Sequence, residues 1–459
     1  MANRAILSGI ITGCLLTALT VLSQLSIKFE TRYHRGSLTM LMISWLYVTL
    51  GIGKILGSVI FSLLAEIVGR KHTLTALCIP FLLSFFMCEL RIHSAVLFIS
   101  KFIAGLSSGG AYVVVPIYIG EVAEKKSRGK LIALIYPSFA AAHFFVIGLL
   151  ERLDGYDLSS ILNYISASLA ITATILAVTL VVESPFYYLK RRRELAAKSS
   201  LVKLRNNASN HQTEFSEIQN QVHPNMPNIE VGVKVRTFVK YSWLKPLLLM
   251  IGILGLISLS GLSSSYFLMS YVSHYDEWEW NLITILHSAV HLLGSFVIPF
   301  IIDKYGRKLP LLISVIFIST TFILMYILVL LVGYTIHISY LLLVASLLSY
   351  LAGDIGVGPI PFVLLGELFP LRNKMICAGM STAIHFTLTL FLPYVILWIN
   401  YLGPGGSYIH IIISVVVAIS LVILIKYFCP ETKGKSLNEI QVEINKNSTQ
   451  SINLPILTE

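Results

Sequence analysis

Charged side chains are scarce in this sequence. Only 12% of its 459 residues are Asp, Glu, Lys or Arg, whereas 56% are hydrophobic. An ordinary soluble domain carries roughly a quarter of charged residues, so water is not the main solvent of this chain. Apolar stretches such as residues 311–332 recur, each long enough for a helix to cross about 30 Å of hydrocarbon. Because a bilayer satisfies no backbone group, these stretches predict an all-α membrane protein.

Residues that carry common enzyme chemistry are also few. The five cysteines, at positions 14, 78, 88, 377 and 429, show no metal-type spacing. The sequence contains no Walker-type phosphate loop, metal-ligand cluster or nucleophile motif. We therefore expect no enzyme, no cofactor and no bound metal.

The basic excess follows the membrane topology. A formal net charge of +11 would by itself suit a nucleic-acid partner. Spans assigned by hydropathy, however, leave 27 of the 34 Lys and Arg in one set of loops and termini, 5 in the other set, and Lys54 and Lys101 within spans. The positive-inside rule places the basic set and both termini in the cytoplasm. We expect a lipid bilayer and no nucleic acid as partner, and the sequence specifies no oligomeric state.

Hydropathy predicts twelve transmembrane helices in two sets of six. The first set covers residues 5–27, 38–65, 73–90, 94–120, 130–150 and 159–182. The second covers residues 243–272, 281–302, 310–332, 338–365, 375–400 and 407–428. We expect an N-terminal six-helix bundle over residues 1–182, a cytoplasmic linker with short helices over 183–240, a C-terminal six-helix bundle over 241–428 and a cytoplasmic tail over 429–459.

Three motifs occur once in each half and in the same order. Residues 66–71 (EIVGRK) match residues 303–308 (DKYGRK), residues 116–121 match 361–367, and residues 183–185 (ESP) match 430–432 (PET). The carboxylates in these pairs are offset by 237 to 248 residues. Repeats of this kind are typical of transporters whose two halves rock about a substrate site at the middle of the membrane.

With these motifs the chain resembles the sugar porter family of the major facilitator superfamily, from about Gly51 to Ile440. Further signature segments are residues 128–129 (RG), 260–261 (SG), 356–361 (GVGPIP), 367–370 (ELFP) and 430–437 (PETKGKSL). Within the family the chain is most similar to the insect-type facilitated trehalose and glucose transporters. The resemblance implies a major facilitator fold, the plasma membrane, and facilitative transport of a sugar (trehalose or a hexose such as glucose) by alternating access.

The repeated charges lie at the predicted cytoplasmic helix ends, where carboxylates meet Arg and Lys in a partly dehydrated region. Such pairs are able to latch the two halves and must separate when the inner side opens. The predicted latch comprises Glu66, Arg70, Glu121, Arg128, Glu183, Asp303, Arg307, Glu367 and Glu431, together with Lys374. Ordinary helix-end charge that fixes topology is the alternative. Gly69 and Gly306 supply tight turns between helices.

A glycine and proline cluster interrupts the predicted tenth span. We expect Gly356, Gly358, Pro359 and Pro361 to break the helix and leave carbonyl groups without helical donors. Such a break is tolerated where it faces protein or a water-filled cavity, which predicts a hinge and a wall of the substrate path. A simple packing kink is the alternative.

The predicted substrate site departs from the family pattern, in which amides suit the vicinal hydroxyls of a sugar. Positions where sugar porters usually carry Gln, Asn or Trp are occupied by Ile257, Ser258, Ser263, Tyr136, His291, Phe362, His385 and Phe386. The substrate-binding candidates are Tyr136, Ser258, Ser263, His291, Phe362 and His385. An interhelical hydrogen bond is an equally good interpretation of each histidine.

Two charge features bear on the transported solute. Lys54 lies near the middle of the second span. A lysine at this depth indicates a contact with an anionic substrate or a pair with another helix. The alternative is that the span is misplaced and the lysine side chain snorkels toward the membrane interface. The first span holds no carboxylate between Ile6 and Ile27, so proton coupling loses its simplest carrier and facilitated diffusion is favoured. Two alternatives stay open: a non-transporting sugar sensor on the same scaffold, and a carrier of a different small solute such as an organic anion.

Overall fold

The structure is a computed structural model that describes residues 4–33, 40–90, 93–149, 158–205, 211–222, 243–259, 277–331, 337–400 and 404–449. All regular structure in these residues is helical. Ten helical segments among them are long and apolar enough to cross a membrane. Two shorter apolar helices, Leu244–Leu259 and Ile412–Phe428, lie at the places of the predicted seventh and twelfth spans. The prediction of an all-α protein with six spans in each half is confirmed.

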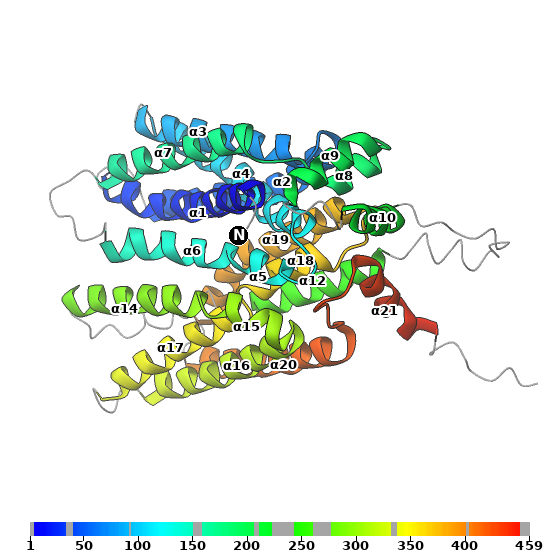
Figure 1. Cartoon of the computed structure of the whole chain (residues 1–459). Coiled ribbons are helices and arrows are strands. Elements are labelled where there is room, and N and C mark those ends of the chain that lie inside the picture. Colours follow the sequence, from blue (N-terminus) through cyan, green and yellow to red (C-terminus); the bar gives the residue numbers. More distant parts are fainter. Residues whose placement is uncertain are drawn as a thin grey trace, which may run out of the picture.

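The first half forms one side of the molecule (Figure 1). Its segments are α1 (Arg4–Tyr33), α2 (Met40–Ile67), α3 (Arg70–Leu90), α4 (Ser94–Val122), α5 (Arg128–Ala133), α6 (Ile135–Phe144), the π-helical η1 (Phe145–Leu149) and α7 (Leu158–Thr179). The predicted fifth span is thus divided into α5, α6 and η1 rather than forming one regular helix.

The linker contributes three short helices, α8 (Pro185–Lys190), α9 (Glu194–Leu204) and α10 (His211–Val222). They share a small apolar core of their own that includes Phe186, Leu201 and Phe215. In Figure 1 these helices lie at one end of the bundle, together with α21 (Leu437–Thr449) near the C-terminus. We call this end of the molecule the linker end.

The second half lies on the other side of Figure 1. It comprises α12 (Leu244–Leu259), α14 (Glu277–Ser295), α15 (Ile298–Tyr305), α16 (Lys308–Leu331), α17 (His337–Ile355), α18 (Ile360–Glu367), α19 (Lys374–Asn400), α20 (Pro404–Ile423) and the π-helical η5 (Leu424–Phe428). The predicted break in the tenth span is observed, because α17 ends at Ile355 and α18 begins at Ile360. At this break Gly358 contacts Tyr136 of the first half so closely that an added Cβ would lie 2.2 Å from its ring.

The halves meet along helix pairs that come one from each half. Helix α2 contacts α19, α4 contacts α18, α5 contacts α15 and α6 contacts α14. Two of these pairs, α4 with α18 and α5 with α15, lie toward the linker end. The repeated charged motifs lie at the same end. The fold therefore brings the two copies of each motif to one end of the molecule.

Helices α2 and α4 cross with their backbones in contact. Gly53 and Gly57 of α2 and Gly105 and Gly109 of α4 form the crossing. A Cβ added to Gly57 would lie 2.0 Å from the carbonyl oxygen of Leu106. A Cβ added to Gly109 would lie 2.0 Å from the carbonyl oxygen of Lys54. Membrane helices approach this closely only through small residues, because packing rather than the hydrophobic effect holds them together. The crossing fixes the backbone position of Lys54.

Substituting Gly57→Ala tests this crossing. We expect the free energy of unfolding to fall by about 1–3 kcal/mol, because the new methyl group overlaps helix backbone that has no room to move. Gly255→Ala on α12 is the matched control, since its Cβ would meet only the Leu388 side chain, at 3.2 Å. Thermal unfolding of both variants in detergent gives the comparison, and equal losses would contradict the tight crossing.

Candidate functional site

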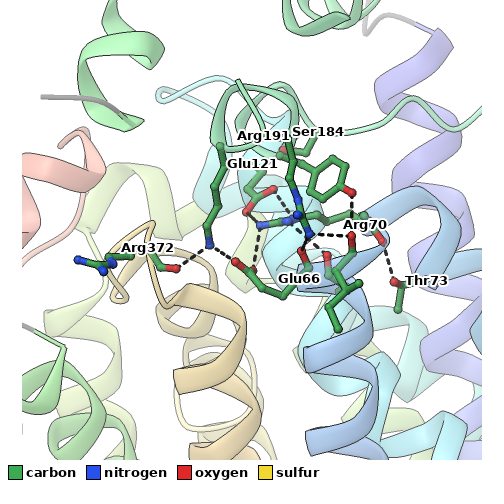
Figure 2. A network of polar contacts seen from close by, with 12 residues as sticks. Glu66, Arg70, Thr73, Glu121, Ser184, Arg191 and Arg372 are labelled. Atoms are coloured by element: carbon green, nitrogen blue, oxygen red, sulfur yellow. Dashed lines mark hydrogen bonds and ion pairs between the residues drawn. The ribbon is translucent and has the colours of Figure 1, made fainter. Parts of the chain in front are cut away.

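A buried guanidinium lies at the start of α3. The Arg70 side chain donates from Nε to Glu121 Oε2 at 3.0 Å and from Nη2 to Glu121 Oε1 at 3.1 Å. Its Nη1 donates to the carbonyl oxygen of Ala65 at 3.3 Å, and Glu66 Oε2 lies 3.9 Å from Nη2 (Figure 2). The planar fork of an arginine matches a carboxylate at two points, so this pair ties the beginning of α3 to the end of α4.

A second carboxylate closes the N-terminus of α3. The backbone N–H groups of Arg70 and Lys71 donate to Glu183 at 2.9 and 3.0 Å. Negative charge at a helix N-terminus is favourable because the first N–H groups have no partner within the helix. Burial raises the pKa of the Glu183 carboxyl, and the backbone N–H bonds oppose that rise. Gly69 turns the chain here at φ +112°, and a Cβ on it would lie 2.4 Å from Glu183.

The second half repeats this arrangement group by group. Arg307 donates from Nε and Nη2 to Glu367 at 3.1 and 2.9 Å, and its Nη1 lies 3.4 Å from Asp303. The backbone N–H groups of Arg307 and Lys308 donate to Glu431 at distances of 3.0 and 3.1 Å. The repeated motifs therefore fold into the same geometry at the start of α16 as at the start of α3.

These strong ion pairs each lie within one half, so they fix helix ends rather than join the halves. Electrostatic influence does cross the boundary. The charge of Glu367 in the second half acts on Arg128 in the first half. The charge of Glu121 in the first half acts on Lys374 in the second half. Both cations are buried, and neither Arg128 Nε nor Lys374 Nζ has a hydrogen-bond partner among the described residues.

Direct contacts between the halves at the linker end involve other groups. The backbone N–H of Lys130 on α5 donates to Asp303 on α15 at 3.3 Å. The Lys190 amine on α8 donates to Glu66 and, at 2.6 Å, to the carbonyl oxygen of Arg372, which Figure 2 shows on the neighbouring helix end. Burial and the charges of Arg191 and Arg372 lower the pKa of Lys190 to about 8. Lys190 was not among the predicted latch residues, so the sequence analysis missed this bridge.

A cavity of about 520 Å³ lies between α2 and α19, a size within the range of about 300–1,000 Å³ typical of small-molecule sites. It lies away from the linker end, because it is lined by the first part of α2 and the second part of α19. Its lining residues are Gln24, Ser44, Tyr47, Leu50, Gly51, Lys54, Tyr112, His385, Phe386, Thr389, Leu390 and Tyr394. Helices of both halves thus form one chamber.

Of the predicted substrate-binding residues that the structure describes, His385 is the one in this lining. Its Nδ1 lies 2.8 Å from Ser258 Oγ and 3.3 Å from the carbonyl oxygen of Leu254. A carbonyl oxygen only accepts, so Nδ1 carries the hydrogen and Nε2 of the neutral ring is an acceptor. The interhelical hydrogen bond of this histidine is therefore present, and its side chain also lies in the cavity wall.

Tyr136 and His291 meet at a different point. The Tyr136 hydroxyl on α6 and the His291 Nδ1 on α14 lie 3.0 and 2.7 Å from the same oxygen of Asp354 on α17. Asp354 is only 1% exposed, so this cluster is buried, and neither Tyr136 nor His291 is among the residues that line the cavity. The Tyr136 bond joins the two halves at membrane depth.

Phe362 packs behind the cavity wall. Its ring centroid lies 5.3 Å from that of Tyr112, and the Phe386 ring meets Tyr112 edge-on at 5.0 Å. Phe362 therefore supports Tyr112, which does line the cavity and which sequence reasoning had not singled out. The remaining candidate, Ser263, lies outside the described residues.

Lys54 projects from the middle of α2 into the cavity wall. Its Nζ donates to Gln24 Oε1 at 3.0 Å and lies 5.8 Å from the centre of the Phe386 ring. Within the described residues no carboxylate lies within 4.0 Å of it. Lys54 lies near the middle of α2, as the predicted second span placed it.

Comparison with known proteins decides the class of this molecule. A family model described as "Sugar (and other) transporter" matches residues 6–444. The chain belongs to this sugar transporter family. It is accordingly a membrane transporter and not an enzyme.

Curated relatives of this sugar transporter include facilitated trehalose transporters from insects. The Tret1 protein of Culex quinquefasciatus is 28% identical, with 87% of this chain and 76% of the relative covered. The Tret1 protein of Aedes aegypti is 27% identical, with 87% of this chain but 49% of the relative covered. The chain therefore spans about half the length of some of the relatives it matches.

Solved structures share the fold of this sugar transporter. The proton:xylose symporter XylE bound to 6-bromo-6-deoxy-D-glucose aligns over 96% of this chain and 98% of its own, with a TM-score of 0.79 at 18% identity. The inward open conformation of XylE from E. coli gives a lower TM-score of 0.65 at 19% identity, over 95% and 98% of the two chains. Both alignments show that this chain and XylE share one fold.

The turn glycines of this sugar transporter offer a test of the repeated carboxylate cap. Gly306→Ala and Gly434→Ala both place a side chain at positive φ, +84° and +69°, which costs about 1–3 kcal/mol. A Cβ on Gly306 would also lie 2.5 Å from Glu431, whereas nothing lies within 4 Å at Gly434. We expect Gly306→Ala to lose about 1–2 kcal/mol more, because Glu431 is displaced from its N–H partners. Equal losses in thermal unfolding would exclude the cap.

Proposed function

We propose that this chain is a facilitative transporter that carries a sugar, trehalose or a hexose such as glucose, by alternating access. One observation carries the proposal. The cavity lies between helices of both halves and away from the linker end, while the linker end is closed by contacts between the halves. The insect relatives, which are named as facilitated trehalose transporters, support the substrate class.

In the proposed movement some contacts stay intact within each half, while others, between the halves, break. The Arg70–Glu121 and Arg307–Glu367 pairs stay intact, because breaking a buried ion pair leaves an uncompensated charge. The bridges made by Lys190 and by the Lys130 backbone open when the linker end opens, and Arg128 and Lys374 lose their carboxylates across the boundary. In this scheme Gly356, Gly358, Pro359 and Pro361 act as the hinge, since the helix is already interrupted there.

We place the linker end in the cytoplasm, with both termini on that side, and the protein in the plasma membrane. Support comes from the distribution of Lys and Arg, which concentrate in the loops and linker at this end. Residues 1–182 and 241–428 are the proposed moving bundles, joined by the linker 183–240 and followed by the tail 429–459.

The cavity wall supplies groups that suit a sugar. His385 Nε2 is an acceptor for a hydroxyl, and the hydroxyl groups of Ser44, Tyr47 and Thr389 act as donors or acceptors. Tyr112 and Phe386 offer ring faces to sugar C–H groups. Tyr136 and His291 would act through Asp354, and Ser258 through His385, rather than by direct contact.

Uptake by purified protein in liposomes tests this function. We expect saturable exchange of labelled trehalose or glucose whose rate does not change when a proton gradient is imposed. His385→Ala should raise KM roughly tenfold, because the sugar loses an acceptor and Ser258 a buried partner. His72→Ala, an exposed histidine at the linker end, is the matched control and should leave KM unchanged.

Two results would contradict the proposal. No exchange of any mono- or disaccharide by folded protein excludes sugar transport. Sugar binding without exchange across the bilayer favours the alternative of a non-transporting sensor on the same scaffold.

A further inference from the structure

We propose that Lys54 forms an anion site in the cavity, so that a sugar carrying a carboxylate or a phosphate is preferred over a neutral sugar of the same size. The inference rests on the proposed sugar transport and narrows its substrate class. It begins from the position of one cation. Lys54 lies at the middle of α2, and its side chain belongs to the wall of the 520 Å³ cavity.

The backbone holds this lysine in place. Gly53 and Gly57 flank it on α2, and both contact the backbone of α4. The Lys54 carbonyl oxygen itself lies against Gly109. Because these contacts involve main-chain atoms, they fix the Lys54 backbone at the depth of the cavity, and the hydrogen bond to Gln24 holds the amine there.

Within the part of the chain that the structure describes, the partners of the Lys54 amine are neutral. Gln24 Oε1 accepts one hydrogen bond at 3.0 Å, and the Phe386 ring at 5.8 Å offers a cation–π contact. An ammonium group has three donors, so these partners leave donors for a ligand. Among the described lining residues Lys54 is the only one with a formal charge, and a positive charge at membrane depth is costly without a negative partner. An anion in the cavity supplies that partner.

Lys101 is a second lysine within a span of the same half. Its amine is buried, donates to Ser26 Oγ at 2.7 Å and lies 3.6 Å from Cys88 Sγ. It is not part of the cavity wall. Lys54 differs in facing a chamber large enough for a ligand.

The other lining groups identify the rest of the ligand as a polyol. Around Lys54 the cavity presents the His385 Nε2 acceptor, hydroxyl groups of Tyr47 and Thr389, and the aromatic ring of Tyr112. A small inorganic anion would leave most of these groups unused. A sugar ring against the aromatic residues, with its anionic substituent at Lys54, uses both the charge and the hydroxyl partners.

Binding to purified protein in detergent, measured by titration calorimetry, tests the inference. The probes are D-glucuronate, its neutral methyl ester, glucose 6-phosphate and glucose. We expect glucuronate to bind about 10- to 100-fold more tightly than the methyl ester, because a hydrogen bond to a charged group is stronger than a neutral one. The glucuronate and glucose 6-phosphate arms decide whether a carboxylate or a phosphate is preferred.

Matched variants assign the effect to one residue. Lys54→Gln should abolish the preference for the acid over the ester, while Lys54→Arg should keep it. Lys198→Gln, on α9 at the linker end, is the control and should behave as the unchanged protein. If Lys54→Gln does not fold, the acid and ester still give the comparison on the unchanged protein.

Each outcome separates this inference from the proposed function. Equal binding of acid and ester, or a preference that survives in Lys54→Gln, overturns the anion site. Exchange of glucose in liposomes together with equal binding leaves sugar transport standing and removes the anion site alone. Tight binding of glucuronate with no exchange of any sugar supports the anion site and contradicts transport.

Discussion

A buried guanidinium needs a carboxylate, and the rest of this structure depends on that requirement. At the start of α3 and again at the start of α16, an arginine no more than 2% exposed is bound at two points by a glutamate from another helix, Glu121 of α4 or Glu367 of α18. Removing one partner of such a pair typically costs about 3–5 kcal/mol. Each half is therefore held as a unit at the linker end, and relative movement is left to the weaker contacts between halves.

The contacts between halves differ in kind from those within them. At the linker end they are a backbone N–H to Asp303, the Lys190 bridge to Glu66 and the Arg372 carbonyl, and the buried cations Arg128 and Lys374. At membrane depth the Tyr136–Asp354 bond adds one more. Among the described residues, few direct bonds join the halves at the linker end, and the cavity lies on the far side of them. This asymmetry is what a carrier needs if opening one end is to close the other.

The sequence predicted what is local or repeated. The turn glycines, the arginine motifs and the break after Ile355 follow from short segments, because glycine and proline set backbone geometry within a few residues. The cavity wall was harder to predict. Gln24, Lys54, Tyr112 and Phe386 come from four helices far apart in the chain, and no spacing rule brings them together. Tyr136 and His291 were expected at the substrate, yet a third residue, Asp354, gathers them into a cluster of their own.

The central claim is that two rigid halves move against each other at the linker end. Spin-label distance measurements test it most directly, in a background without the five native cysteines. Labels at Lys126 and Tyr305 report across the halves, and labels at Lys126 and Val68 report within the first half. We predict that saturating sugar shifts the distance distribution of the first pair and leaves that of the second unchanged. An unchanged first pair, or an equal shift in both, would contradict the account.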